Sequence, residues 1–444
     1  LEYAFVVLAL LIGSSMLVCL PSNKIGWDEE VHFGRSYRLA MIGETEELPN
    51  QISSFFTVSA YNWPLVQPGA VEENEAFDNI NNEFYENAEK DTEVQGWTSG
   101  VYTPGYVFEA IGIKIAKIFN ASFSTVVFMG RFASLISFII LVFLSIRTIP
   151  IGKEILFFLS IMPTSIFIAI TYNYDVVVYG CIVLGLSMIL KEWLTKDHEV
   201  NWKNLLIACI CLFIGCIPKA VYAPIVLLPL LIPKERFTNQ KQAKLIKLSF
   251  IILFIILVSS FVLPSLMGKA TNDTRGGAVD STQQLSLILS HPIEYTKVLL
   301  KNIFDNFPSF VFGEATFRSM GHIGTAGFAY LVPITATMLI VTSPQEENVE
   351  IMTIKNRIFI FVMIALTVAL VWTSMYMAFT VPGSTIIMGV QGRYYRPFLL
   401  LFYLIISPNL KISIKKETYR YALMVVCFII LSVTLLQIMS LYCL

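Results

Sequence analysis

Long apolar runs alternate with polar connections along nearly the whole chain of 444 residues. A helix of about 20 apolar residues is long enough to cross the hydrocarbon core of a bilayer. The pattern therefore predicts an all-α integral membrane protein with about eleven transmembrane helices. We expect them at residues 1–20, 124–146, 155–172, 175–191, 204–217, 219–233, 248–266, 325–341, 357–380, 397–410 and 421–444.

One apolar stretch, residues 101–119, differs from these because it carries Glu109, Lys114 and Lys117. On a helical wheel the three charged residues share one arc. The opposite arc is apolar and holds Val107, Phe108, Ile111, Ile115, Ile118 and Phe119. This separation is typical of a helix that lies in the membrane interface, so we do not count the stretch as a span.

The basic residues gather in alternate connections, which the positive-inside rule places in the cytoplasm. These connections contain Arg147/Lys153, Lys191/Lys196/Lys203, Lys234/Arg236/Lys241/Lys244/Lys247, Lys355/Arg357 and Lys411/Lys415/Lys416/Arg420. Residues 1–444 then form a single polytopic domain with two long outer loops, 21–123 with interfacial helices and 267–324. We expect a multi-pass membrane protein whose two long loops face outside.

The composition fits this class and excludes others. Hydrophobic residues make up 55% of the chain and charged residues only 14%, which is too apolar for a soluble protein of this length. Residues 28–93 carry fifteen acids against Arg35, Arg38 and Lys90, so nucleic acid is not an expected partner. The seven cysteines lie in or beside apolar runs, and we expect no disulfide framework and no zinc site.

The densest charged stretch, Gly26–Arg35, directly follows the first apolar run. If it is helical, Asp28, His32 and Arg35 share one face, and Glu29 is a second carboxylate directly beside Asp28 in the chain. Such a face can carry out acid/base chemistry at the membrane surface. The alternative is an interfacial helix whose acids only keep its outer side hydrated.

Further polar residues fall in the other outer connections. Asp175 lies between two apolar runs, where a carboxylate is costly unless it is paired or hydrated; it is either catalytic or a helix cap. Lys219 follows Pro218 at a break between two short apolar runs. It either binds a lipid phosphate or extends toward the interface.

The segment Gln391–Pro397 combines Arg393 and Arg396 with Tyr394 just before an apolar run. Arginine recognises phosphate with two donors, and the neighbouring Gly392 would let a phosphate approach closely. The alternative is a basic flank that anchors a helix. Within the loop 267–324, Glu314 and His322 are candidates for a second acid/base group or an acceptor contact, or are solvated loop residues.

In these features the chain resembles the GT-C type membrane glycosyltransferases. More closely, it resembles a family of largely uncharacterised bacterial membrane proteins grouped with that clan, and it is distantly similar to bacterial oligosaccharyltransferases. The resemblance covers most of the chain and rests on four short motifs: Trp27-Asp28-Glu29 with His32-Phe33, Tyr102-Thr103-Pro104, Asn173-Tyr174-Asp175 and Gln391-Gly392-Arg393-Tyr394.

The resemblance implies a sugar donor linked to polyprenyl phosphate and a glycan, lipid or protein acceptor, with membrane lipids as surroundings. It makes Asp28 the general base, Glu29 its support or alternate and Asp175 the second outer acid, and it places the active site at the outside of a bacterial plasma membrane. In oligosaccharyltransferases that acid helps to hold a divalent metal. Here the turn has one Asp where those enzymes have a pair, so we assign no metal ligand; Mg²⁺ or Mn²⁺ would use Asp28 and Asp175.

The expected reaction is a single displacement with inversion. Asp28 takes the proton of an acceptor hydroxyl, which a general base accelerates by about 10²- to 10⁴-fold. Arg393, with Lys219 or Arg396, stabilises the departing phosphate. Two alternatives keep the same substrate class: a transporter or flippase of lipid-linked saccharides, and a ligase or polymerase that transfers a whole glycan.

Overall fold

The computed structural model describes residues 1–22, 25–41, 104–197, 199–267, 273–342, 348–408 and 415–443. In these ranges the regular structure is helical, apart from two isolated β-bridges, Thr195 with Val349 and Ser319 with Thr325. The all-α class is therefore confirmed. Most of the first outer loop, including Tyr102 and Thr103 of one motif, lies outside the described residues.

Within the described residues, six helices are long and apolar enough to cross a membrane. They are α1 (Glu2–Cys19), α6 (Phe123–Thr148), α9 (Asp175–Leu194), α11 (Gln240–Leu266), α16 (Ile354–Phe379) and α18 (Lys416–Tyr442). The expected count of about eleven spans is not supported. The other expected spans do form helices, but these are short: α7 (Lys153–Ile161), α8 (Pro163–Ala169), α10 (Trp202–Cys216), η2 (Ala220–Leu231), α15 (Leu331–Thr342) and α17 (Arg396–Ile406).

Proline explains two of the short elements. Pro163 follows the end of α7 and starts a separate helix, α8, because its ring disfavours a helical residue before it. Pro224 and Pro229 lie inside η2, which is a 3-10 helix and not an α-helix. Even α10, at 15 residues, rises only about 22 Å, less than the roughly 30 Å of a bilayer core.

The stretch that we expect in the membrane interface forms η1 (Pro104–Tyr106) and α5 (Val107–Ile118), and α5 is not among the candidate spans. Val107, Ile111 and Ile115 are exposed, whereas Glu109 is buried against the rest of the protein. Residues 21–123, which we expect to be the first outer loop, also contain α2 (Glu29–Ala40), which packs on α5.

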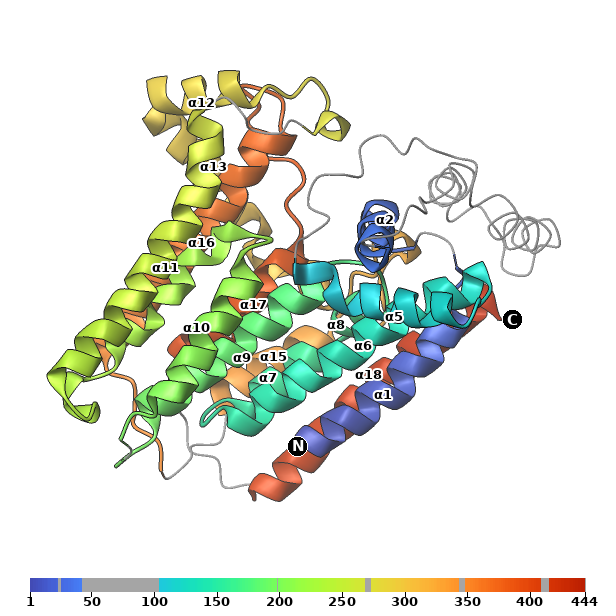
Figure 1. Cartoon of the computed structure of the whole chain (residues 1–444), viewed down its shortest axis with the longest axis horizontal. Coiled ribbons are helices and arrows are strands. Elements are labelled where there is room, and N and C mark those ends of the chain that lie inside the picture. The colour runs from blue at the N-terminus through green and yellow to red at the C-terminus, as the bar shows by residue number, and fades with distance from the viewer. Residues whose placement is uncertain are drawn as a thin grey trace.

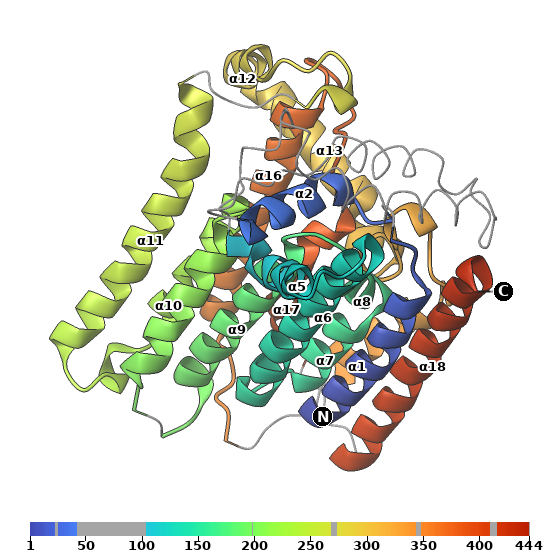
Figure 2. The same ribbon diagram turned by 45° about the vertical axis from the view of Figure 1, so that its right-hand side comes forward.

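The long helices run roughly side by side with α7, α10, α15 and α17 among them, whereas α2 and α12 lie toward one end (Figures 1 and 2). Helix α6 packs between α1 and α9, and α9 packs on α10. Helices α12 (Ser281–Ser290) and α13 (Pro292–Val311) extend beyond α16 on the side of α2. The remaining elements are η3 (Lys234–Arg236), η4 (Thr274–Gly276), α14 (Glu314–Phe317), η5 (Gly321–Ile323) and η6 (Gly392–Tyr395).

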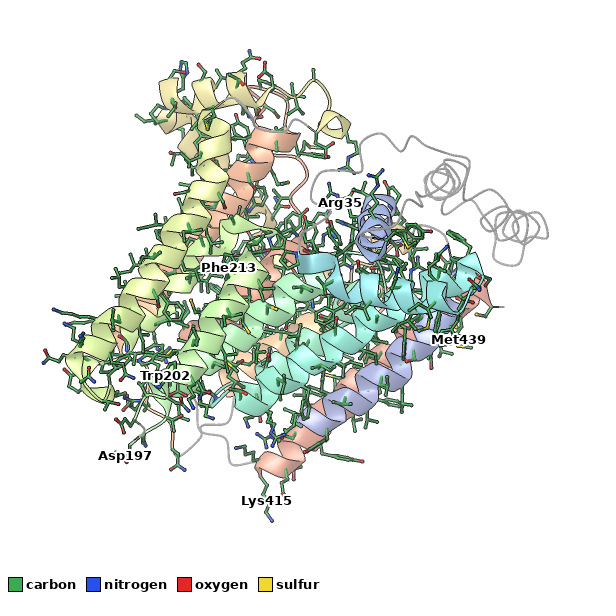
Figure 3. The ribbon with its side chains drawn as sticks, viewed as in Figure 1. Arg35, Asp197, Trp202, Phe213, Lys415 and Met439 are labelled. Carbon is green, nitrogen blue, oxygen red and sulfur yellow. The ribbon has the colours of Figure 1, made fainter. Side chains whose placement is uncertain are left out.

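Figure 3 shows the two ends of the molecule through labelled side chains. Arg35 lies on α2 at one end, whereas Asp197, Trp202 and Lys415 lie at the opposite end. The latter three belong to the connections that carry basic residues. The two groups of connections that the charge pattern separated are therefore at opposite ends of the bundle.

The contact between α5 and α6 depends on a glycine. A Cβ at Gly112 would lie 2.2 Å from the carbonyl oxygen of Met129, closer than any side chain can approach. We expect Gly112→Ala to lower the free energy of unfolding by about 1–3 kcal/mol through overpacking. Thermal unfolding of the detergent-purified protein measures this. The control is Gly327→Ala, whose Cβ would meet Val433 at an ordinary 3.5 Å; equal stability of both variants would contradict the packing.

Candidate functional site

Glu29 is fully buried and holds the first outer segment against the helical bundle. One carboxylate oxygen accepts hydrogen bonds from Arg131 Nε and the Tyr172 amide, both at 2.9 Å. The other accepts from the amides of Ile25 at 2.9 Å and Gly26 at 2.8 Å. Arg131, itself 1% exposed, also donates to the carbonyl oxygen of Pro21 at 2.7 Å. Both charges of this buried ion pair are therefore satisfied.

Glu109 makes a parallel connection from α5. Its carboxyl accepts from the Asn173 amide at 2.9 Å and from the hydroxyl of Ser36 on α2. Burial raises the pKa of Glu109 well above its usual range, although these two hydrogen bonds act in the opposite direction. Glu29 and Glu109 thus bind the consecutive amides of Tyr172 and Asn173, and we call these four residues the turn clamp. The clamp fixes the turn that leads into Asp175.

The expected helical face required Asp28 to lie within α2. Asp28 instead directly precedes this helix. It occupies the left-handed region with φ of 54°, which is uncommon for residues other than glycine. Although it lies at the N-cap position, its side chain makes no capping hydrogen bond. The carboxylate instead forms an ion pair with Arg275 and lies 4.0 Å from Arg393 Nη2.

Asp175 lies at the start of α9 and faces the same arginine. Its carboxylate contacts Lys219 Nζ at 2.5 Å and Arg393 Nη1 at 3.4 Å. Arg393, 7% exposed, therefore lies between the two outer acids. We call Asp28, Asp175, Lys219, Arg275 and Arg393 the charge cluster. Four of its members were expected at the site from sequence, and Arg275 was not.

Aromatic rings surround the cations of the cluster. Lys219 Nζ lies 4.1 Å from the ring centre of Tyr394 and 5.0 Å from that of Tyr174. The guanidinium of Arg393 stacks over Trp27 at 4.6 Å. Burial lowers the pKa of Lys219 to about 8, while the charge of Asp175 opposes that shift. These contacts hold the cations in place without neutralising them.

His32 and Arg35 meet at Tyr106 and not at Asp28. The His32 Nδ1 shares a hydrogen bond of 2.9 Å with the Tyr106 hydroxyl, which also accepts from Arg35 Nη1 at 3.2 Å. Burial lowers the pKa of His32 to about 3, and the charge of Asp28 offsets this only in part. His32 is therefore neutral at physiological pH, which suits a positioning role better than a charged contact.

Arg396, the first residue of α17, lies behind the cluster. Its guanidinium stacks over Tyr179 at 4.4 Å and is 2% exposed. Its Nε and Nη2 have no hydrogen-bond partner among the described residues. The structure therefore keeps Arg396 out of the ion pairs of Asp28 and Asp175.

Gly392 has a packing role that differs from the one expected. A Cβ there would lie 2.3 Å from the carbonyl carbon of Ala315, and the Gly392 carbonyl accepts from the Thr316 hydroxyl at 3.0 Å. The missing side chain thus lets η6 pack against α14 and leaves no space for a phosphate. This contact positions Arg393 and Tyr394.

Glu314 and His322 lie on neighbouring elements outside the charge cluster. Glu314 pairs with Arg318 at 3.5 Å and accepts from Thr325 at 3.2 Å, and its side chain is 59% exposed. His322 is exposed, and its backbone amide donates to the Ile25 carbonyl at 3.1 Å. The structure brings neither side chain into the ion pairs of the cluster.

The site does not fit a divalent cation. Each oxygen of Asp28 and Asp175 that the cluster engages already faces Arg275, Lys219 or Arg393, so a metal would meet three positive charges. Among the described residues no group of three or more His, Cys, Asp or Glu side chains is arranged to hold a metal ion. The Asp28 and Asp175 pair considered for Mg²⁺ or Mn²⁺ is bridged by a guanidinium instead.

Two arginines that pair with carboxylates of the site were not expected from sequence, and they differ in the signal they carry. Arg275 is one of many charged residues in the second outer loop, and nothing in its neighbourhood marks it. Arg131 lies inside an apolar run, where an arginine without lipid access signals a buried partner. The position of Arg131 in the sequence is therefore enough to mark it as a residue with a buried partner.

The fold and the site define an all-helical membrane protein with a buried charge cluster at one end of its bundle. The comparison with protein families adds that residues 10–402 match the family described as Predicted membrane protein (DUF2142). The chain belongs to this family. Neither a curated protein nor a solved structure matches the chain.

The turn clamp generates a stability prediction. We expect Glu29→Gln to lower the free energy of unfolding by about 3–5 kcal/mol, because it leaves the buried Arg131 charge uncompensated. Chemical or thermal unfolding in detergent measures the loss. The control is Glu294→Gln, which removes an exposed pair with Lys297 and should change stability by less than about 1 kcal/mol. Similar values for both variants would show that the pair does not hold the site together.

Proposed function

We propose that this protein is a membrane glycosyltransferase of the GT-C type. It moves a sugar from a polyprenyl-phosphate donor to an extracytoplasmic acceptor at the outer face of a bacterial plasma membrane. The observation that supports this most is Arg393, which lies between the carboxylates of Asp28 and Asp175 at the end of the bundle that carries the outer loops. Under this proposal the shorter apolar helices also lie within the bilayer and bring the crossings to about eleven.

Asp28 is the general base. Its side chain is 32% exposed, so an acceptor hydroxyl can reach it, whereas Asp175 is 11% exposed. Burial alone would raise the pKa of Asp28, but the hydrogen bond and charge of Arg275 and the charge of Arg393 lower it. The carboxylate is therefore ionised at neutral pH and ready to accept a proton.

Arg393 and Lys219 bind the donor phosphate. Both are buried cations that share the carboxylate of Asp175, and the aromatic rings beside them do not remove their charge. Lys219 remains mostly protonated at neutral pH, since its pKa is about 8. Arg396 adds positive electrostatic potential to the phosphate site. Its Nε and Nη2 have no hydrogen-bond partner among the described residues, so no carboxylate offsets the charge at these two atoms. Negative charge that grows on the leaving phosphate is stabilised here.

The reaction is one displacement with inversion. The acceptor oxygen attacks the anomeric carbon, its proton passes to Asp28, and the bond from that carbon to the phosphate oxygen breaks. Polyprenyl phosphate leaves with the bonding electrons. Asp175 keeps Lys219 and Arg393 oriented, and Glu29 positions Asp28 through the turn clamp. The walls of the donor and acceptor sites are formed by His32, Arg35 and Tyr394. The acceptor side is bordered by Glu314 and His322.

The role of Asp28 is tested by replacement with asparagine, which preserves the size and tolerates the left-handed backbone. We expect transfer of radiolabelled sugar from polyprenyl-linked donors to fall about 10²- to 10⁴-fold while donor binding persists. Glu294→Gln, at an exposed position outside the charge cluster, is the control and should transfer normally. Unchanged transfer by Asp28→Asn would show that Asp28 is not the general base. Donor movement across vesicles without transfer by the wild type would favour a flippase.

Arg275 generates a pH prediction. Because Arg275 lowers the pKa of Asp28, Arg275→Gln should raise that pKa. The base is active above its pKa, so the acid limb of the profile of transfer rate against pH should move to higher pH in the variant. Lys297→Gln, which removes an exposed cation outside the cluster, should leave the limb in place. If the acid limb does not move in Arg275→Gln, the limb does not report the titration of Asp28.

A further inference from the structure

Two cysteines lie together at the site end of the bundle. Cys19 is the last residue of α1, and Cys443 directly follows α18. The two helices run side by side and end near each other, as both views show (Figures 1 and 2). Helices α1 and α18 are in contact, and the side chains of Cys19 and Cys443 are near neighbours at their ends. Cys19 is half-buried and Cys443 is exposed, so reagents can reach the pair.

The other five cysteines have different surroundings. Cys181, Cys211, Cys216 and Cys427 are buried within helices, and Cys209 is half-buried on α10. From the sequence we expected no disulfide framework, because the seven cysteines lie in or beside apolar runs. Cys19 and Cys443 differ because each lies at the end of its run.

The ends of both helices lead to the segment that carries Asp28. Two residues after Cys19, the Pro21 carbonyl accepts from Arg131, which binds Glu29. Leu17, Val18 and Leu20 also form one wall of a cleft of about 260 Å³ whose other wall is the start of α6.

From α18, Gln437 donates to the Thr325 carbonyl at 3.1 Å. In the same loop the His322 amide donates to the carbonyl of Ile25. The Ile25 amide is in turn bound by Glu29. A covalent bond between the two helix ends would therefore fix the segment on which the turn clamp acts.

We propose that Cys19 and Cys443 form a disulfide that joins the ends of α1 and α18. This modification rests on the proposed function in one respect, since it needs the site end to face the oxidising outer compartment. The two thiols lose two protons and two electrons to the disulfide of a thiol oxidoreductase, which becomes a dithiol. The exposed Cys443 attacks first, and Cys19 resolves the mixed disulfide.

The test uses the full chain expressed in bacterial membranes. Acid quenching and alkylation with N-ethylmaleimide before solubilisation trap the thiols, and mass spectrometry compares reduced and unreduced peptides. We expect a linked Cys19–Cys443 peptide, with Cys209 alkylated in the same sample as the control. In Cys443→Ser, Cys19 should become alkylated. The purified protein treated with oxidised glutathione is measured in parallel.

Two results would overturn the proposal. If Cys19 and Cys443 are both alkylated in cells and stay unlinked after treatment with oxidised glutathione, the two thiols do not reach bonding geometry. A bond formed only with oxidised glutathione would show that the pair is not modified in cells. Sugar transfer by Cys443→Ser separates this proposal from the enzymatic one, because Cys443 takes no part in the chemistry. Transfer at the wild-type level would leave the glycosyltransferase proposal standing whichever state the cysteines have.

Discussion

The buried ion pair between Glu29 and Arg131 determines how the segments of the site come together. A carboxylate and a guanidinium taken out of water cost several kcal/mol each unless every polar atom finds a partner. Here the partners are backbone groups from separate segments, including the Tyr172 amide and the Pro21 carbonyl. Satisfying the charges therefore requires the first loop, α6 and the turn before α9 to meet in one arrangement.

The charge cluster follows from that arrangement. Glu29 and Glu109 fix the turn that ends at Asp175, while Glu29 also fixes the backbone next to Asp28. Arg393 then reaches both acids from η6, which is placed by the close packing of Gly392 on α14. The carboxyl groups of Glu29 and Glu109 are buried and hydrogen-bonded to backbone amides, whereas the Asp28 carboxylate is partly exposed. The adjacent acids Asp28 and Glu29 thus have different roles because one is partly exposed and the other is buried.

The sequence was sufficient to predict the helical class and most of the cluster. Asp28, Asp175, Lys219 and Arg393 were identified because each is a charge beside an apolar run, where burial is costly. Hydropathy predicted more spans than there are long helices, because it does not show where a proline such as Pro163 ends one helix and starts another. The direction of the Asp28 side chain could not be predicted, since it depends on a left-handed backbone angle. Arg275 was not predicted because its role depends on the ion pair with Asp28, which lies 247 positions earlier in the chain.

If the protein is the proposed transferase, the cluster of Asp28, Asp175, Lys219 and Arg393 receives the phosphate of a polyprenyl carrier. The decisive measurement is a cryo-EM structure of the full chain in nanodiscs with a polyprenyl monophosphate. We expect phosphate density within hydrogen-bond distance of Arg393 and Lys219, on the side open to Asp28. Phosphate density elsewhere, with the ion pairs of Asp28 and Asp175 unchanged, would contradict the proposed function.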